Sequence, residues 1–157
     1  MKITIIAYTP QYQPDFARLN YAWIEKFFKI EAEDRRALDH PDEKIIDKGG
    51  HILLALDAQT NAIVGTVALV KMTDNGYELA KMSVAETHQG FGIGKQLGIA
   101  ALEKVREIGG IRVYIETNSS LKTALKLYEQ LGFTYLPPQD SPYERSDTQL
   151  ELWLATE

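Results

Sequence analysis

The chain has 157 residues, of which 45% are hydrophobic and 25% charged, and its formal net charge is −5. This balance is typical of one compact globular domain, and the sequence has neither an apolar run of roughly 20 residues that could span a bilayer nor a basic run that would favour nucleic acid. The absence of cysteine excludes disulfides, thiolate metal ligands and cysteine nucleophiles. We therefore expect a single domain over residues 1–157, located in the cytoplasm, with no nucleic-acid or membrane partner.

The first forty residues predict a strand followed by two helices. Residues 2–8 show an alternating pattern that includes β-branched side chains, which favours a strand, and two prolines then break the pattern. Asp15 is a candidate cap for the first helix. The segment 31–38, which is rich in acidic residues, predicts a short second helix that stops before Pro41. Apolar residues at steps of three and four place one face of the first helix against a sheet: Phe16, Leu19, Trp23, Phe27 and Ile30.

Three strands are predicted in the middle of the chain. Residues 51–56 and 63–72 are apolar and rich in β-branched side chains, and the polar segment between them suggests an antiparallel pair. The dipeptide Asn75-Gly76 accepts positive φ in a tight hairpin, so residues 77–84 should pair back on residues 63–72.

The second half alternates helices and strands. A helix from Ile93 should end at Gly109-Gly110, and a second helix, marked by Leu121, Leu125 and Tyr128, should end at Gly132. Three further strands are predicted at residues 111–117, 133–136 and 149–154. The order of elements predicts a mixed α/β sandwich.

A glycine-rich turn lies between the strand 77–84 and the helix that follows. Gly90, Gly92 and Gly94 precede or open this helix, where exposed N–H groups and the helix dipole attract an anion such as phosphate, and Lys95 can add a charge. The spacing lacks one residue of a dinucleotide fingerprint and of a P-loop, and Gln96 replaces the hydroxyl that binds magnesium. Spacing alone also permits glycines that serve only the geometry of the turn.

The turn resembles the pyrophosphate-binding motif of the GNAT superfamily of N-acetyltransferases, Gln/Arg-x-x-Gly-x-Gly/Ala, which Gln89-x-x-Gly92-x-Gly94 matches in full. Residues 78–84 are similar to the family's central strand. A second family segment is matched downstream, in the right order, by Asn118, Ala124, Leu127-Tyr128 and Leu131-Gly132-Phe133.

The resemblance implies the GNAT-like acyl-CoA N-acyltransferase fold, an α/β (α+β) architecture with a mixed, mostly antiparallel sheet and helices on both faces. It implies that strands 77–84 and 111–117 splay apart and that acetyl-CoA, the co-substrate, lies between them. Gly90 stands where the family often has arginine, which puts one cationic phosphate contact in doubt. The cofactor-binding residues implied are Met82, Ser83, Val84, Gln89, Gly90, Phe91, Gly92, Ile93, Gly94, Lys95, Asn118, Ala124 and Tyr128.

The implied chemistry is acetyl transfer to a primary amine, with two catalytic candidates. Glu78 is placed to accept the proton of the amine through water, and the alternative is an exposed strand glutamate. Tyr128 resembles the family's general acid, which protonates the leaving thiolate, and the alternative is a side chain that only extends an apolar helix face. Asn118 can contact the cofactor or substrate, or it can cap the following helix.

Several other residues favour a structural role. His88 beside the turn is expected to be a solvent-exposed loop residue, and Trp23 and Phe27 are expected in the core, although with Phe28 they could line an acceptor pocket. No group of histidines and carboxylates has a metal-ligand spacing, so no catalytic metal is expected.

Two alternatives to amine acetylation stay open. One is a CoA-binding sensor or interaction module without chemistry, and the other is an acyltransferase that uses a hydroxyl acceptor or a longer acyl donor. The acceptor itself is not encoded in a recognisable motif. Residues 20–48 and 137–148 are the segments in which an acceptor site, or a homodimer contact, is expected.

Overall fold

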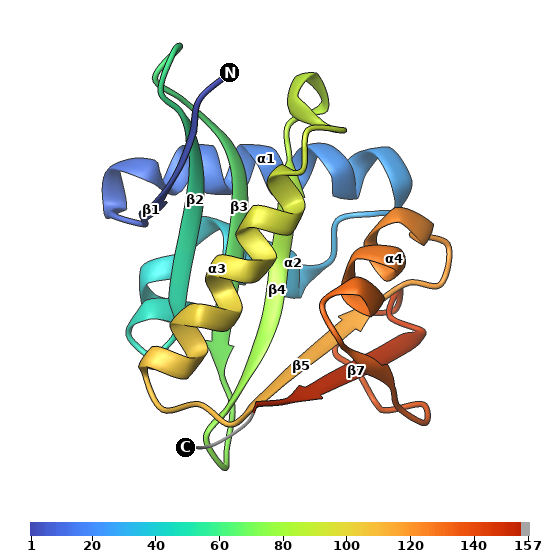
Figure 1. Ribbon diagram of the computed structural model, residues 1–157. Coiled ribbons are helices and arrows are strands. Elements are labelled where there is room, and N and C mark those ends of the chain that lie inside the picture. The colour runs from blue at the N-terminus through green and yellow to red at the C-terminus, as the bar shows by residue number, and fades with distance from the viewer. Residues whose placement is uncertain (155–157) are drawn as a thin grey trace.

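A seven-stranded sheet with helices on both faces forms the centre of the molecule (Figure 1). The structure is a computed structural model that describes residues 1–154. The strand order is β1-β2-β3-β4-β5-β7-β6, and every neighbouring pair is antiparallel except β4 and β5, which run parallel. The predicted mixed, mostly antiparallel sheet is therefore confirmed.

The elements follow the predicted order. The strands are β1 (Ile3–Ala7), β2 (His51–Asp57), β3 (Ala62–Lys71), β4 (Gly76–Val84), β5 (Arg112–Thr117), β6 (Thr134–Tyr135) and β7 (Thr148–Trp153). The α-helices are α1 (Gln13–Phe27), α2 (Ala32–Asp39), α3 (Ile93–Glu107) and α4 (Lys122–Gln130). Shorter helical turns are η1 (Pro10–Tyr12), η2 (Asp42–Ile46) and η3 (Glu86–His88), of which η2 is a π-helix.

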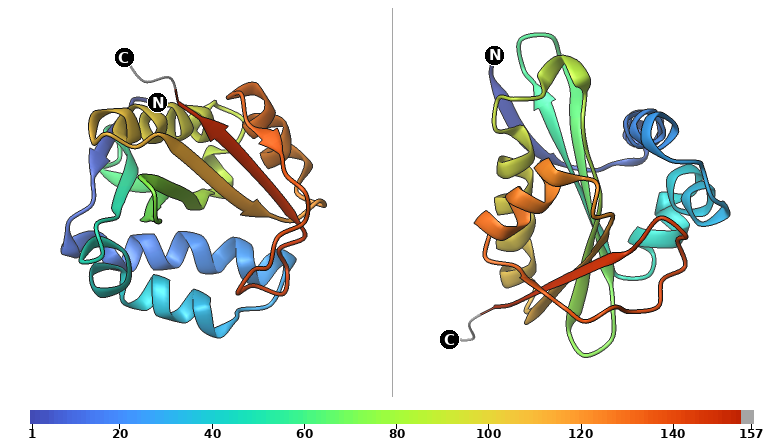
Figure 2. Two further views of the ribbon diagram at one scale, coloured as in Figure 1. Left: turned by 90° about the horizontal axis from the view of Figure 1, so that it is seen from below. Right: turned by 90° about the vertical axis from the view of Figure 1, so that its right-hand side faces the viewer.

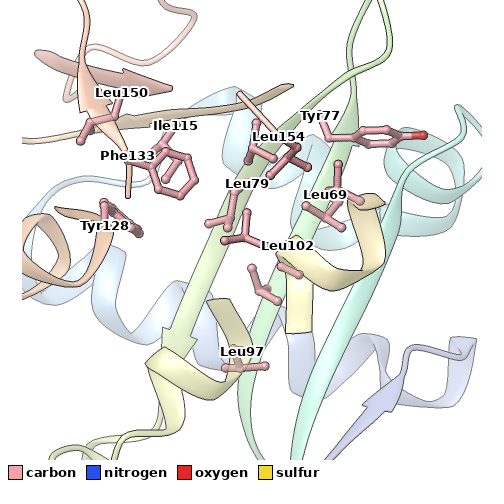
Figure 3. Close-up of a cluster of buried hydrophobic side chains, with 14 of the residues drawn as sticks. Leu69, Tyr77, Leu79, Leu97, Leu102, Ile115, Tyr128, Phe133, Leu150 and Leu154 are labelled. Carbon is pink, nitrogen blue, oxygen red and sulfur yellow. The ribbon is translucent and has the colours of Figure 1, made fainter. Parts of the chain in front are cut away.

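Two hydrophobic clusters hold the helices on the sheet. Helices α1 and α2 cover one face and α3 and α4 cover the other, as the edge-on view in Figure 2 shows. The cluster under α3 and α4 is drawn in Figure 3 and includes Leu79, Leu97, Ile115, Tyr128 and Phe133. The cluster on the opposite face is built on Phe16, Ile24, Leu38 and Leu54. The sheet is thus buried on both sides.

The limits of the first helix differ from the prediction. Helix α1 begins at Gln13, because Pro14 falls in its first turn, where a missing N–H costs nothing. Asp15 is therefore not its cap, and its carboxylate instead bonds Arg18 at 3.1 Å. The helix ends at Phe27, so Ile30 lies outside it.

The β3–β4 hairpin pairs as predicted, but its turn is centred one residue earlier. Positive φ angles occur at Asp74 (56°) and Asn75 (59°), and Gly76 is already the first residue of β4. Aspartate and asparagine are the side chains that tolerate this backbone region best after glycine. The closing strands also differ, since the first of them is reduced to Thr134–Tyr135.

A β-bulge interrupts β4 opposite Val67, where the register with β3 shifts between Thr66 and Ala68. Lys81 lies at the bulge with φ of 54°, a left-handed conformation that is strained for a side chain other than glycine, asparagine or aspartate. The Thr66 hydroxyl donates to the Lys81 carbonyl at 2.7 Å and holds this conformation. Because a bulge opposes two residues to one, the side chains of both Ala80 and Lys81 turn to the α1–α2 face.

Candidate active site

The parallel strands β4 and β5 stay together for only three residue pairs, which end at Glu78 and Tyr114. Beyond this point they diverge, and a cleft of about 1060 Å³ opens between them. It is lined by residues 78–84 of β4, by Glu116 and Thr117 of β5, and by one face of α4. The splayed strands that the resemblance implied are therefore present.

The glycine-rich turn lies at one end of this cleft. Gly90 and Gly92 have φ angles of 85° and 80°, so a side chain at either would be strained even though no other group approaches within 4 Å of an added Cβ. Gly92 occupies the cap position of α3, and the first turn of α3 contains no acidic residue. The N–H groups of Ile93, Gly94 and Lys95 have no partner within the helix, which makes this end suited to phosphate.

The backbone of β4 presents hydrogen-bonding groups to the cleft. The Ala85 N–H donates to Val64 in β3 at 2.8 Å, and because successive residues of a strand alternate in direction, the polar groups of Val84 and Met82 face away from β3. The Gln89 side chain confirms this direction, since its amide donates to the Val84 carbonyl at 3.1 Å. Ser83 points the other way, and its hydroxyl donates to the Leu19 carbonyl at 2.8 Å.

Three lysines surround the phosphate end of the cleft. Lys95 comes from α3, while Lys122 and Lys126 lie one helical turn apart on α4, where Ala124 also lines the wall. None of the three forms an ion pair with another residue in the part of the chain described. The two lysines of α4 were missed in the sequence, because helical spacing alone does not distinguish them from a solvated helix face. Phe91 in the turn is 64% exposed and projects from it.

Tyr128 is buried against the wall of the cleft. Its ring is 7% exposed and packs edge-on against Phe133 at 6.1 Å between centroids, as Figure 3 shows. Burial raises the pKa of its hydroxyl to about 12, and that hydroxyl bonds no other residue between 1 and 154. The side chain therefore belongs to the apolar helix face and also brings a protonated, unpaired donor to the cleft.

Glu78 is half-buried in the cleft and is not an exposed strand residue. Burial, and then the negative charge of Glu116, raise the pKa of its carboxyl to about 7, while the Lys81 ammonium opposes the shift. Glu116 is fixed by two donors, the Tyr114 hydroxyl at 3.0 Å and the Ser141 hydroxyl at 2.6 Å. A carboxylate whose pKa lies near neutrality is matched to proton transfer at physiological pH.

A buried ion network on the α1–α2 face was not predicted from the sequence. Asp34 is fully buried and accepts two hydrogen bonds from Arg145, at 2.8 and 2.5 Å, and one from the Lys81 ammonium at 3.2 Å. Lys81 also donates to the Tyr143 hydroxyl at 3.0 Å. The network joins α2, the bulge of β4 and the loop before β7, so it shapes the wall of the cleft.

Two polar residues that line the cleft, His88 and Asn118, are held by side-chain hydrogen bonds. His88 is not a free loop residue, because its Nε2 atom lies 3.0 Å from a carboxylate oxygen of the buried Asp57. Asn118 does not cap α4, whose cap position is Leu121. Its amide donates to the Arg145 carbonyl at 2.7 Å and its oxygen accepts the Ser120 N–H at 2.8 Å, so it anchors a loop beside the cleft.

The end of α1 contributes aromatic side chains to the cleft. Phe27, expected in the core, is 57% exposed and lines the cleft with Trp23 and Phe28. The helix ends at Phe27, so this residue is carried past the edge of the hydrophobic cluster. Trp23 packs against the hydrophobic cluster, as expected, and also lines the cleft, whereas the expected core position was wrong for Phe27.

Among residues 1–154, no helix is both long and apolar enough to cross a bilayer. The same residues contain no group of three histidine or carboxylate side chains arranged to hold a metal ion.

The chain is similar to known acetyltransferases in sequence. A model of the acetyltransferase (GNAT) family matches residues 12–133. A segment of 59 residues is 44% identical to YjgM, an uncharacterized N-acetyltransferase of Escherichia coli, and it covers 38% of this chain and 35% of that protein. The match thus spans about a third of the length of YjgM.

The chain also shares its fold with solved structures. An acetyltransferase of the GNAT family from Staphylococcus aureus Mu50 has a TM-score of 0.87 and 23% identity over 98% of this chain and 100% of that chain. YncA from Salmonella typhimurium, solved with its cofactor acetyl-CoA, has a TM-score of 0.75 and 17% identity over 100% of this chain and 96% of that chain. These likenesses confirm the predicted acyl-CoA N-acyltransferase fold.

Proposed function

The chain belongs to the GNAT family of acetyltransferases, and we propose that it transfers an acetyl group from acetyl-CoA to a primary amine by direct attack. One observation carries this proposal. A single cleft through the sheet connects a helix N-terminus that is suited to phosphate with a half-buried carboxyl of pKa about 7 and a buried tyrosine side chain. These are the groups that a thioester of a phosphorylated carrier and a protonated amine require.

Acetyl-CoA would bind along β4 with its pyrophosphate at the turn. The N–H groups of residues 93–95 and the ammonium groups of Lys95, Lys122 and Lys126 supply the positive potential. The backbone groups of Met82 and Val84 that face away from β3 would pair with the pantetheine amides, as in the addition of a strand to an open sheet edge. The Gln89 amide would then give up its hydrogen bond to the Val84 carbonyl. The two lysines of α4 compensate for Gly90, which stands where the family often has arginine.

The nucleophile must first lose a proton. An aliphatic amine with a pKa near 10.4 is only about 0.04% neutral at pH 7, which corresponds to a cost of roughly 4.6 kcal/mol. Glu78, as a carboxylate, would accept this proton, directly or through one water molecule. The amine nitrogen then forms a bond to the thioester carbonyl carbon.

The tetrahedral intermediate collapses with cleavage of the bond between carbon and sulfur. Tyr128 would donate a hydrogen bond and then its hydroxyl proton to the departing sulfur, so that CoA leaves as the thiol. The nitrogen loses its second proton as the amide forms, and this proton returns to Tyr128 through water. The high pKa of Tyr128 keeps this donor protonated at neutral pH. Because a thiol has a pKa near 8.5, the hydrogen bond to the developing thiolate, rather than early proton transfer, is expected to give most of the stabilisation.

The release of thiol tests the proposal. On mixing the protein with acetyl-CoA and a panel of amines, we expect free thiol and an equal amount of acetylated amine. A CoA-binding sensor would instead show saturable binding without release. Mass spectrometry of the products distinguishes amide from ester and acetyl from a longer acyl group, and it thereby tests the alternatives of a hydroxyl acceptor or another donor.

The pKa of Glu78 predicts the pH profile. The base must be ionised, so kcat/KM should fall as the pH decreases below about 7, and Glu78→Gln should remove this limb and lower turnover by about 10²-fold. Glu116→Gln removes the neighbouring negative charge, so the limb should move to lower pH. An unchanged profile in Glu78→Gln would exclude Glu78 as the base.

A further inference from the structure

The acceptor end of the cleft has an acidic floor. Glu78 and Glu116 lie on the α1–α2 face of the neighbouring strands β4 and β5, since the alternate residues Leu79 and Ile115 belong to the cluster on the opposite face. Burial, and then the negative charge of Glu116, raise the pKa of Glu78. Carboxylates at this position attract the cationic form of an amine and hold it next to the proposed base. The floor therefore identifies where the reacting nitrogen would lie.

Three cations line the same cleft from the side of α2 and η2, and they form what we call the rim. Arg36 of α2, Lys44 of η2 and Lys48, two residues beyond η2, all line the cleft. Arg36 pairs with Glu33, and Lys44 lies 3.6 Å from Glu43, while Lys48 forms no ion pair with any described residue. Glu33 is the one carboxylate that α2 and η2 add to the described lining. With Glu43, the partner of Lys44, two carboxylates offset the three cations, so the rim keeps one positive charge in excess.

An apolar wall lies beside the acidic floor. Ala37, Ile45 and Val70 line the cleft and pack in one hydrophobic cluster, and Val70 is the direct strand partner of Glu78. Arg36 and Lys44 directly precede Ala37 and Ile45 in the chain, so these two cations flank the wall on the side of α2 and η2. An acceptor that reaches from the floor to these cations passes over this apolar surface.

We infer that the acceptor is an amine that carries an anionic group, a carboxylate or a phosphate, at the far end of an apolar spacer. The inference rests on the proposed function and specifies the class of its acceptor. The amine would lie at the acidic floor, the spacer along Ala37, Ile45 and Val70, and the anion at Lys44, Lys48 and Arg36. A diamine of the same length would place its second cation against the positive rim.

A matched set of six-carbon amines tests this inference: 6-aminohexanoate, 6-aminohexyl phosphate, 6-aminohexanamide and 1,6-diaminohexane. We expect kcat/KM for at least one anionic amine to exceed that of the amide by about tenfold, with the diamine lowest, and we expect the difference to shrink at high salt. The better of the two anions identifies the anionic group as carboxylate or phosphate.

Rim variants connect the preference to the residues. Replacement of both rim lysines, Lys44→Ala with Lys48→Ala, should bring the ratio of anionic amine to amide close to one while acetylation of the amide persists. Lys48→Glu should favour the diamine. Lys104→Ala removes a lysine of α3 that does not line this cleft, so it should keep the wild-type ratio.

Two failures can be told apart. Equal or better acetylation of the amide and the diamine by the wild-type protein would overturn the inference and leave the proposed function intact. A preference for anionic amines that survives the double lysine variant would overturn the assignment to this rim. Absence of thiol release with every amine, despite binding of acetyl-CoA, would overturn the proposed function itself.

Discussion

Replacing Tyr128 with phenylalanine is expected to lower turnover by roughly 10²-fold to 10⁴-fold while the affinity for acetyl-CoA stays nearly unchanged. The substitution removes only the hydroxyl that would bond the departing sulfur. The ring keeps its edge-on contact with Phe133 and its place in the hydrophobic cluster. Steady-state kinetics measured as thiol release, together with CoA binding by calorimetry, would separate the two effects.

The structure offers a matched control for this variant. Tyr135→Phe removes the hydroxyl of a half-exposed tyrosine in β6, which bonds Glu129 and does not line the cleft. Its turnover should equal that of the wild type. The hydroxyl of Tyr128 bonds no described residue, so Tyr128→Phe should unfold at the wild-type denaturant concentration. Full turnover in a folded Tyr128→Phe would show that Tyr128 has no role beyond packing.

The phosphate end of the site could be predicted because its signal is local. The features of this end all lie within about twenty residues of sequence: a strand, two positions with positive φ, and a helix start without acidic residues. Each of these features is favoured by particular residue types, such as glycine where φ is positive. The hairpin and the order of the elements along the chain were predictable for the same reason. The periodicity of apolar residues and the residue types at turns indicate these elements, and neither depends on segments that are distant in the sequence.

The acceptor side could not be predicted because its contacts join distant segments. Asp34 meets Lys81 across 47 positions and Arg145 across 111, and nothing in the pattern around any of them indicates a buried charge. The bulge that turns Lys81 toward Asp34 also leaves no motif, since lysine is disfavoured at positive φ.

Two errors have the same physical origin. Phe27 continues the apolar period of α1, but the helix ends there and exposes the ring to the cleft, so periodicity overestimated the buried face. His88 was expected to be a solvent-exposed residue of the loop beside the turn, whereas its partner Asp57 comes from β2, 31 positions away. Local polarity does not determine which side chains a fold brings together.

Asp34→Ala is expected to lower the free energy of unfolding by about 3 to 5 kcal/mol, because it leaves two cations without their main counter-charge in a buried site. The side chains of Arg145 and Lys81 are only 12% and 8% exposed. Arg145 keeps one carboxylate partner, Glu31 at 3.2 Å, whereas Lys81 keeps the Tyr143 hydroxyl alone among its described hydrogen-bond partners. Urea denaturation at pH 7 measures the difference.

Asp140→Ala is the matched control, since Asp140 is an exposed aspartate of the loop before β7 and its loss should cost less than about 1 kcal/mol. The pH dependence gives a second check. Burial would raise the pKa of Asp34, but hydrogen bonds from Arg145 and from the Glu31 N–H, with the Lys81 charge, lower it below its usual value.

Because folding lowers the pKa of Asp34, the charge of this residue stabilises the fold fully at a pH above the pKa in the unfolded chain, near 3.8. This contribution is lost as the pH falls through the lower pKa in the folded protein. The wild type and Asp34→Ala should therefore converge in stability in acid and differ most near neutrality. An equal difference at both ends of this pH range would show that Asp34 acts through packing and helix capping rather than through its charge. Because the same network fixes Lys81 beside Glu78, a loss of charge at Asp34 should also change the acid limb of the activity profile.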